Sequence, residues 1–323
     1  MVNHLSNSGQ VQRVYDSNHF PGSHFPEGLF SEERSTPFEM IKRPVFLVGS
    51  ERSGTTLLRL MLDHHTHITI GAAFEYAVQR LDKAGNYPKL DNYYQCLQTD
   101  SDFLTDGATI DRRLSYPALV NSFLKQRQCF TNKPIVGAAL HRHFDRLLKI
   151  WPDAVFIHMV RDGRDVARSC MKMGWAGDGW HGAKHWLYAE RLWDRVKAQL
   201  PEHRYLEVRF EELIYDNVGT LDKICQFIGN RTSATEHTSG NASATLRYHP
   251  DMMNYAQETG YSLPDESLVN QWHHKLSKRE IQLIESRLAP LLVDRGYDLS
   301  GLPHLRVSKL GRIGLKVQNK LGL

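Results

Sequence analysis

Long apolar runs, paired cysteines and a surplus of charge of one sign are all missing from this sequence. No stretch of about 18 apolar residues occurs, so the sequence predicts no transmembrane helix. The four cysteines form no CxxC pair, which argues against a zinc ribbon or a dithiol redox motif and predicts reduced, mostly buried thiols. The first residues lack a basic flank followed by an apolar core, so we expect no secretory signal and a cytoplasmic location.

Charge is nearly balanced along the 323 residues. The 40 Lys and Arg against 36 Asp and Glu give a formal net charge of +4, which suits an anionic small ligand but is too low for a dedicated nucleic-acid binder. A hydrophobic share of 41% supports one large domain. We expect a flexible N-terminal arm over 1–43, a folded domain over 44–303, and a basic amphipathic tail over 304–323. Such a tail suits a surface helix or weak contact with a membrane surface.

Short apolar segments alternate with helical patterns through the central domain. Residues 45–48 form a fully apolar run rich in β-branched residues, typical of a buried parallel strand, and 155–160 and 205–208 predict a second and a third strand. Helical segments are expected near 116–127, 138–150, 184–199 and 218–228. This alternation predicts an α/β fold, a three-layer, doubly wound parallel sheet. After Gly229 we expect a long loop, followed by a helix that opens with a capping box at Ser277.

A Gly/Ser/Thr-rich turn joins the strand at 45–48 to an apolar helical pattern. In such a turn successive backbone N–H groups and the positive end of a helix converge on one anion, which suits a phosphate or sulfate. Thr55 stands where a Walker motif needs lysine, and the spacing is not GxGxxG, so neither a nucleoside triphosphatase nor a nicotinamide enzyme is favoured. The residues expected to hold the anion are Ser50, Glu51, Arg52, Ser53, Gly54, Thr55 and Thr56, with Arg52 as the cation.

A second anion site is predicted at the carboxyl end of the strand 155–160. Arg161 ends this strand, and Ser169 follows two helical turns later. The fork of an arginine and the hydroxyl of a serine make a sensible pair for a terminal dianion.

These two segments together resemble the PAPS-dependent sulfotransferases, especially the bacterial and tyrosylprotein-sulfotransferase-like branch, whose fold is P-loop-like. PAPS is 3′-phosphoadenosine 5′-phosphosulfate. The segment 44–59 resembles the family's 5′-phosphosulfate loop, and 160–169 resembles its 3′-phosphate motif, with Arg and Ser eight residues apart. Residues 208–213 are similar to the segment whose aromatic residue lies near the adenine, with Phe210 where Tyr is frequent. The resemblance extends over about 44–299 and implies PAPS as co-substrate and sulfuryl transfer to a hydroxyl or amine.

Two residues compete for the role of the base that takes the acceptor's proton. Glu75 follows a predicted strand at 68–70, but the glutamate of the tyrosylprotein branch would fall, by counting, at Ala72 or Ala73. His141 lies in the region where cytosolic sulfotransferases carry their base histidine. The lysine that many relatives have nearby is missing, so His141 or Arg142 would have to supply its charge.

Metal chemistry gains little support from the histidines. His181 and His185 share a helical face, but two histidines make half a zinc site at best, and sulfuryl transfer from PAPS needs no metal. The rival functions are a P-loop kinase or phosphotransferase and a noncatalytic nucleotide-binding module. The acceptor, whether small molecule, carbohydrate or peptide, is not specified by the sequence, and no nucleic acid is expected as partner.

Overall fold

The computed structural model describes residues 40–82, 84–229 and 265–305. Residues 1–39 of the expected arm, most of the long loop after Gly229 and residues 306–323 of the expected tail lie outside these residues. Within them a five-stranded sheet has the order β2-β3-β1-β4-β5, and every neighbouring pair is parallel. The strands are β1 (Val45–Gly49), β2 (Ile68–Ala73), β3 (Ile135–Leu140), β4 (Val155–Val160) and β5 (Tyr205–Arg209).

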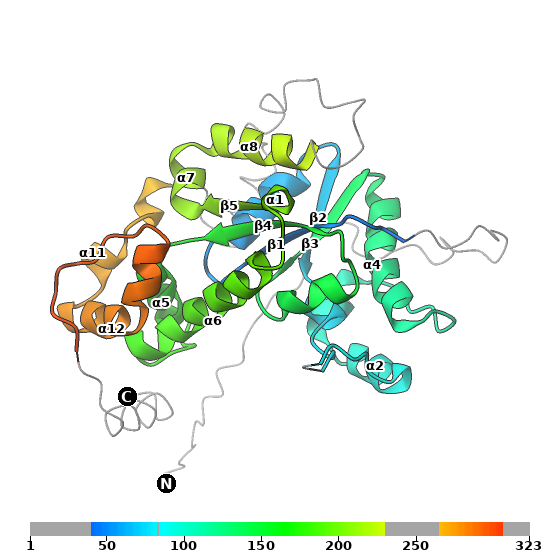
Figure 1. Cartoon of the computed structure of the whole chain (residues 1–323), viewed down its shortest axis with the longest axis horizontal. Helices are drawn as coiled ribbons and strands as arrows, with labels where there is room; N and C mark the ends of the chain where they lie inside the picture. The colour runs from blue at the N-terminus through cyan, green and yellow to red at the C-terminus, as the bar shows by residue number, and fades with distance from the viewer. Residues whose placement is uncertain (1–39, 83, 230–264, 306–323) are drawn as a thin grey trace, which may run out of the picture.

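Helices cover both faces of this sheet (Figure 1). The alternating side chains of β1 explain this, because Phe46 and Val48 belong to one apolar cluster, and Val45 and Leu47 to another. The first cluster includes residues of α4 and α6, and the second includes residues of α1, α7 and α8. The predicted three-layer α/β architecture is therefore confirmed. The helices are α1 (Thr55–Asp63), α2 (Leu90–Leu97), α3 (Ser101–Asp106), α4 (Tyr116–Thr131), α5 (Gly163–Lys172), α6 (Gly179–Lys197), α7 (Phe210–Tyr215), α8 (Asn217–Gly229), α11 (Trp272–Lys275) and α12 (Lys278–Asp294), with short 3-10 turns at η1 (Glu75–Ala77), η2 (Phe144–Lys149), η3 (Glu202–Arg204) and η4 (Glu266–Leu268).

The strand order creates a switch point in the middle of the sheet. After β1 the chain goes to β2 on one side, and after β4 it goes to β5 on the other. The loops that follow β1 and β4 therefore diverge at the carboxyl edge, which is where open α/β sheets bind ligands. The fold thus brings the two predicted anion sites, which follow the neighbouring strands β1 and β4, to the same edge of the sheet.

One predicted helix was wrong. Residues 138–150 do not form a helix, because 135–140 form β3, and η2 is a short 3-10 segment. Strand β3 is buried on both faces between β1 and β2, so its sequence is a continuous apolar run without period-two alternation. Such a run cannot be told from a buried helix by periodicity alone.

The ends of the elements follow the local sequence closely. The capping box of α12 is present, with the Ser277 N–H donating to Glu280 Oε2 at 2.7 Å and the Glu280 N–H donating to Ser277 Oγ at 3.3 Å.

All four cysteines are free, as expected, but only Cys170 is buried, and Cys129 is exposed. No helix among the described residues is long and apolar enough to cross a membrane.

Candidate active site

The loop between β1 and α1 is a tight turn with two left-handed residues. Arg52 has φ 71° and Gly54 has φ 98°. The backbone N–H of Ser53 donates to the carbonyl of Ser50 at 3.1 Å, and the Ser53 hydroxyl donates to the same oxygen at 2.5 Å. Ser50 and Ser53 are both buried, so the Ser53 hydroxyl stabilises the turn from inside. Glycine is needed at 49, because a β-carbon there would lie 2.4 Å from the Met159 carbonyl oxygen on β4.

The two predicted anion motifs come together in the structure. Arg52 Nε donates to Ser169 Oγ on α5 at 2.9 Å. The Arg161 guanidinium donates from Nη1 to the Arg52 carbonyl at 3.2 Å and from Nη2 to the Leu268 carbonyl at 2.6 Å. Arg52, Arg161 and Ser169 therefore form one continuous cluster at the switch point of the sheet.

Phe210 joins this cluster from the first residue of α7. The Arg161 guanidinium carbon lies 4.1 Å from the centre of the Phe210 ring, a cation–π contact. A β-carbon at Gly54 would lie 2.3 Å from the ring, so the ring rests directly on the phosphate loop. Residues from three predicted segments thus pack against one another, although the sequence places Phe210 more than 150 positions after Gly54.

The donors of this cluster fit an anionic nucleotide. Burial lowers the pKa of Arg161, yet an arginine side chain stays charged in proteins. Its Nε is buried and has no hydrogen-bond partner among the described residues. A buried, charged donor without a partner is costly, and an anionic oxygen would satisfy it. The backbone turn, two arginines, a serine hydroxyl and an aromatic face are the groups that a phosphosulfate, a ribose phosphate and an adenine would need.

Glu75 follows the end of β2 and His141 follows the end of β3, and these two residues contact each other. The backbone N–H of His141 donates to Glu75 Oε1 at 2.7 Å, and His141 Nδ1 lies 3.2 Å from the Gly49 carbonyl oxygen. Glu75 is only 4% exposed, and its Oε2 has no hydrogen-bond partner among the described residues. The two candidate bases therefore belong to one local arrangement beside the phosphate loop.

A register shift in β2 accounts for one position of the offset between Glu75 and the position expected by counting. The pairing of β2 with β3 is irregular between Gly71 and Ala73, so Gly71 faces Ala138 and Ala73 faces Ala139. One extra residue in the strand moves all following side chains along by one position. Glu75 reaches the edge of the sheet on η1, whereas Ala73 is still part of the strand.

Glu51 is the one acidic side chain of the phosphate loop, and it is paired. His185 Nδ1 on α6 lies 2.9 Å from Glu51 Oε2, and Arg142 Nε lies 3.6 Å from Oε1. The hydrogen bond to His185 is the main cause of a lowered pKa of Glu51, with Arg142 and His141 adding to it against the effect of burial. The sequence did not reveal this pair, because its members are 134 positions apart.

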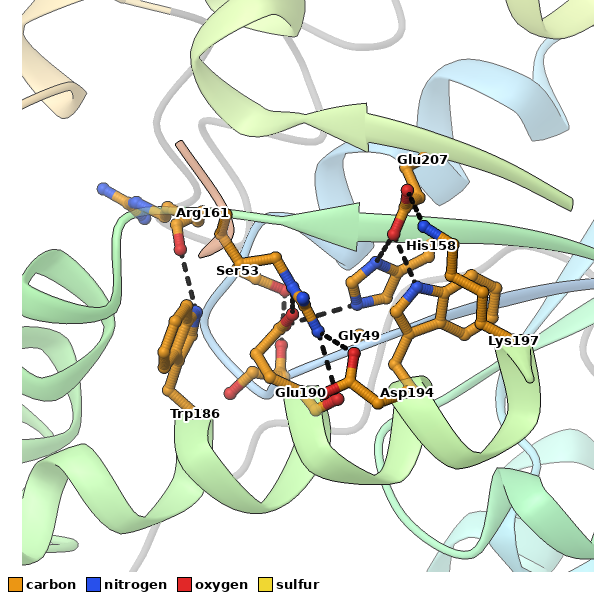
Figure 2. A network of polar contacts seen from close by, with 12 residues as sticks. Gly49, Ser53, His158, Arg161, Trp186, Glu190, Asp194, Lys197 and Glu207 are labelled. Carbon is orange, nitrogen blue, oxygen red and sulfur yellow. Dashed lines mark hydrogen bonds and ion pairs between the residues drawn. The ribbon is translucent and has the colours of Figure 1, made fainter. Parts of the chain in front are cut away.

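A buried polar network supports β4 behind the phosphate loop, as Figure 2 shows. His158 on β4 lies between Glu190, at 3.2 Å, and Glu207, at 3.9 Å, and stacks on the Trp193 ring with centroids 4.5 Å apart. Arg295 Nε donates to Glu190 Oε2 at 2.7 Å. His158 and Glu190 are fully buried, and the hydrogen bond from Arg295 connects the residue after α12 to α6.

Two further contacts hold the Arg161 end of β4 and were not foreseen. Trp186 Nε1 on α6 donates to the Arg161 carbonyl at 2.9 Å, which Figure 2 also shows. The backbone N–H of Trp272 donates to Asp165 Oδ1 at 2.7 Å and connects α11 to α5. No local sequence pattern indicates the contact of Trp186 with Arg161 or that of Arg161 with the Leu268 carbonyl.

No group of three or more possible metal ligands occurs within residues 40–82, 84–229 and 265–305. The two histidines of α6 instead each face a carboxylate. His181 Nδ1 lies 2.8 Å from Asp178 Oδ2, and His185 pairs with Glu51 as described. Each imidazole thus has its own acidic partner.

The sheet order and the glycine-bearing turn after β1 define an α/β protein of the P-loop-like class. A model of the sulfotransferase family matches residues 44–233, more than half of the chain, and the chain belongs to that family. The resemblance noted in the sequence is therefore confirmed at the level of the family.

Individual relatives are distant. The omega-hydroxy-beta-dihydromenaquinone-9 sulfotransferase Stf3 of Mycobacterium bovis is 25% identical over 242 residues, which cover 58% of this chain and 62% of that protein. The protein-tyrosine sulfotransferase A of Caenorhabditis elegans is 23% identical over 211 residues, covering 60% of this chain and 50% of that protein. The chain thus matches between half and two thirds of the length of these relatives.

A solved structure agrees with the fold. The sulfotransferase domain of the Synechococcus PCC 7002 olefin synthase superposes with a TM-score of 0.53 at 19% identity, covering 84% of this chain and 100% of that domain. This likeness concerns the arrangement of the strands and helices.

Proposed function

We propose that this protein transfers a sulfuryl group from PAPS to a hydroxyl or amine acceptor. The observation that carries the proposal is the hydrogen bond from Arg52 to Ser169, which joins the two anion motifs into one site. In this reading the loop 49–56 holds the 5′-phosphosulfate, Arg161 and Ser169 hold the 3′-phosphate, and Phe210 offers its ring to the adenine. When bound, PAPS supplies a sulfuryl group on an already activated phosphate leaving group.

Arg52 has the role of stabilising the negative charge that develops on the leaving 5′-phosphate. The left-handed backbone at Arg52 places this residue inside the turn, and the Ser169 hydroxyl fixes its guanidinium. Negative charge on the bridging oxygen grows as the bond to sulfur breaks. A preorganised cation at that point lowers the barrier more than it strengthens binding of the ground state.

His141 has the role of proton acceptor, with Glu75 as its positioning residue. A carbonyl oxygen can only accept, so the contact with Gly49 places the proton of the neutral ring on Nδ1 and leaves the lone pair on Nε2. Nε2 then takes the proton of the acceptor hydroxyl as that oxygen bonds to sulfur. The Glu75 carboxylate fixes the backbone of His141, and a direct role of Glu75 as base is the alternative.

The proposed class of acceptor rests on the names of the two relatives. Those names describe sulfation of a dihydromenaquinone and of protein tyrosine, and both reactions end on a hydroxyl. We therefore propose a hydroxyl acceptor on a small molecule or a peptide, with carbohydrates also compatible.

Titration calorimetry with adenosine 3′,5′-bisphosphate (PAP), ATP and ADP tests the nucleotide specificity. Binding of PAP without Mg²⁺, and tighter than ATP or ADP, is the expected result. ATP preference that depends on Mg²⁺ would point to a phosphotransferase instead. The protein could also bind nucleotide but transfer no sulfuryl group from PAPS to any of a panel of phenols, alcohols and peptides. This result would favour a noncatalytic nucleotide-binding module.

A further inference from the structure

The phosphate loop carries a carboxylate where it is expected to receive a dianion. Glu51 directly precedes Arg52, and its side chain is 22% exposed. Like charges disfavour each other, so an unpaired Glu51 would oppose the binding of a phosphate or phosphosulfate. The loop therefore needs a side chain that pairs with the Glu51 carboxylate.

Two residues outside the loop pair with this carboxylate. His185 Nδ1, on the second turn of α6, hydrogen-bonds Glu51 Oε2 at 2.9 Å. Arg142, which follows β3, lies 3.6 Å from Oε1, but its side chain is 59% exposed, so solvent weakens this pair. His185 makes the shorter contact, and its ring also lies beside that of Trp175, with centroids 6.1 Å apart.

We propose that His185 is a positioning residue that anchors and compensates the Glu51 carboxylate, so that the phosphate loop accepts the 5′-phosphosulfate. This role rests on the proposed function and adds to it a residue outside both anion motifs. Glu51 is then a structural member of the loop whose carboxylate must be held by a hydrogen bond, and this carboxylate does not itself bind the nucleotide. The lowered pKa of Glu51 agrees with this assignment, because its main cause is the hydrogen bond from His185, which stabilises the ionised carboxylate.

The test is a double-mutant cycle read by nucleotide affinity. PAP and adenosine 3′-monophosphate are titrated into the full-length parent, His185→Ala, Glu51→Gln and the double variant. We expect His185→Ala to bind PAP about tenfold more weakly and to bind the 3′-monophosphate unchanged, since only PAP places charge at the loop. In the double variant the affinity for PAP should return to within about twofold of Glu51→Gln. Glu51→Gln alone should bind PAP at least as tightly as the parent.

Two further variants provide controls. His181→Ala removes a histidine from the same helix that pairs with Asp178 at 2.8 Å, and it should leave both affinities unchanged. His185→Gln keeps a side-chain N–H donor and should recover part of the affinity for PAP, even if His185→Ala folds poorly.

The outcomes separate the two proposals. Equal weakening of both nucleotides, or no rescue by Glu51→Gln, would overturn the role of His185. Weaker PAP binding by Glu51→Gln alone would also overturn it, since the carboxylate would then contribute to binding. Failure of the parent itself to bind PAP would instead refute the proposed function.

Discussion

Arg52 and Ser169 are 117 positions apart in the chain, yet Arg52 Nε donates a hydrogen bond to Ser169 Oγ at 2.9 Å. This contact joins the loop after β1 to helix α5, which follows β4. Both side chains belong to segments that the sequence associates with opposite ends of one nucleotide. Their contact makes the leaving-group side and the 3′-phosphate side of the proposed site a single polar cluster.

Arg52→Ala should lower kcat by about 100-fold, the usual effect of removing a preorganised group that stabilises developing charge. The Kd for PAP should change much less, because the charge on the leaving oxygen develops mainly in the transition state. Steady-state kinetics and calorimetry on the same preparation measure both. An equal loss in binding and turnover would show that Arg52 acts mainly in nucleotide binding.

Arg161→Ala should weaken PAP binding by about 1.5–3 kcal/mol, the typical worth of a hydrogen bond to a charged group. The loss should be far smaller for adenosine 5′-monophosphate, which lacks the 3′-phosphate. Arg191→Ala, which removes an exposed arginine of α6, is the matched control and should have no effect. Unchanged PAP affinity in Arg161→Ala would remove Arg161 from the site.

His141→Ala should lower kcat by at least about 100-fold while the Kd for PAP stays constant, as expected for loss of a general base. Glu75→Gln keeps an oxygen that can accept from the His141 N–H, so its loss of rate should be much smaller. His143→Ala, two residues along the same loop, is the control. An inactive Glu75→Gln together with an active His141→Ala would assign the base to Glu75.

Asp165→Asn should stabilise the protein at pH 7. Burial raises the pKa of Asp165 from 3.8 to about 6, so the folded state binds this proton more tightly than the unfolded state. The contribution of Asp165 to the free energy of unfolding therefore falls as pH rises from about 4 to 6. The difference between variant and parent should be at most about 3 kcal/mol at pH 7, because one pKa unit corresponds to about 1.4 kcal/mol.

Urea denaturation of both proteins from pH 4 to pH 8 measures this difference. Asparagine keeps an oxygen that can accept from the Trp272 N–H, so the contact between α5 and α11 is preserved. The two proteins should be equally stable near pH 4. A variant less stable than the parent at every pH would contradict a raised pKa of Asp165.

Local patterns predicted the central part of this fold well. The apolar runs at β1 and β4 and the capping box at Ser277 depend on residues close in sequence, and the structure has all three. The helix expected over 138–150 failed, because residues 138–140 end strand β3, whose glycine and alanine residues have low β-propensity and do not indicate a strand.

The site was predictable in its motifs but not in its pairings. The sequence singled out Arg52, Arg161 and Ser169, and the structure brings them together. The partnership of Glu51 with His185 depends on how α6 lies against the phosphate loop, which no local pattern encodes. The contact between Glu75 and the backbone of His141 joins residues 66 positions apart, which residue counting cannot detect.

The Phe210 ring occupies the space that a side chain at position 54 would need. Any larger residue at 54 would push this ring off the turn and away from the guanidinium of Arg161. Positions 54 and 210 should consequently change together among sequences that share this architecture, so that an aromatic residue at 210 occurs only beside glycine at 54.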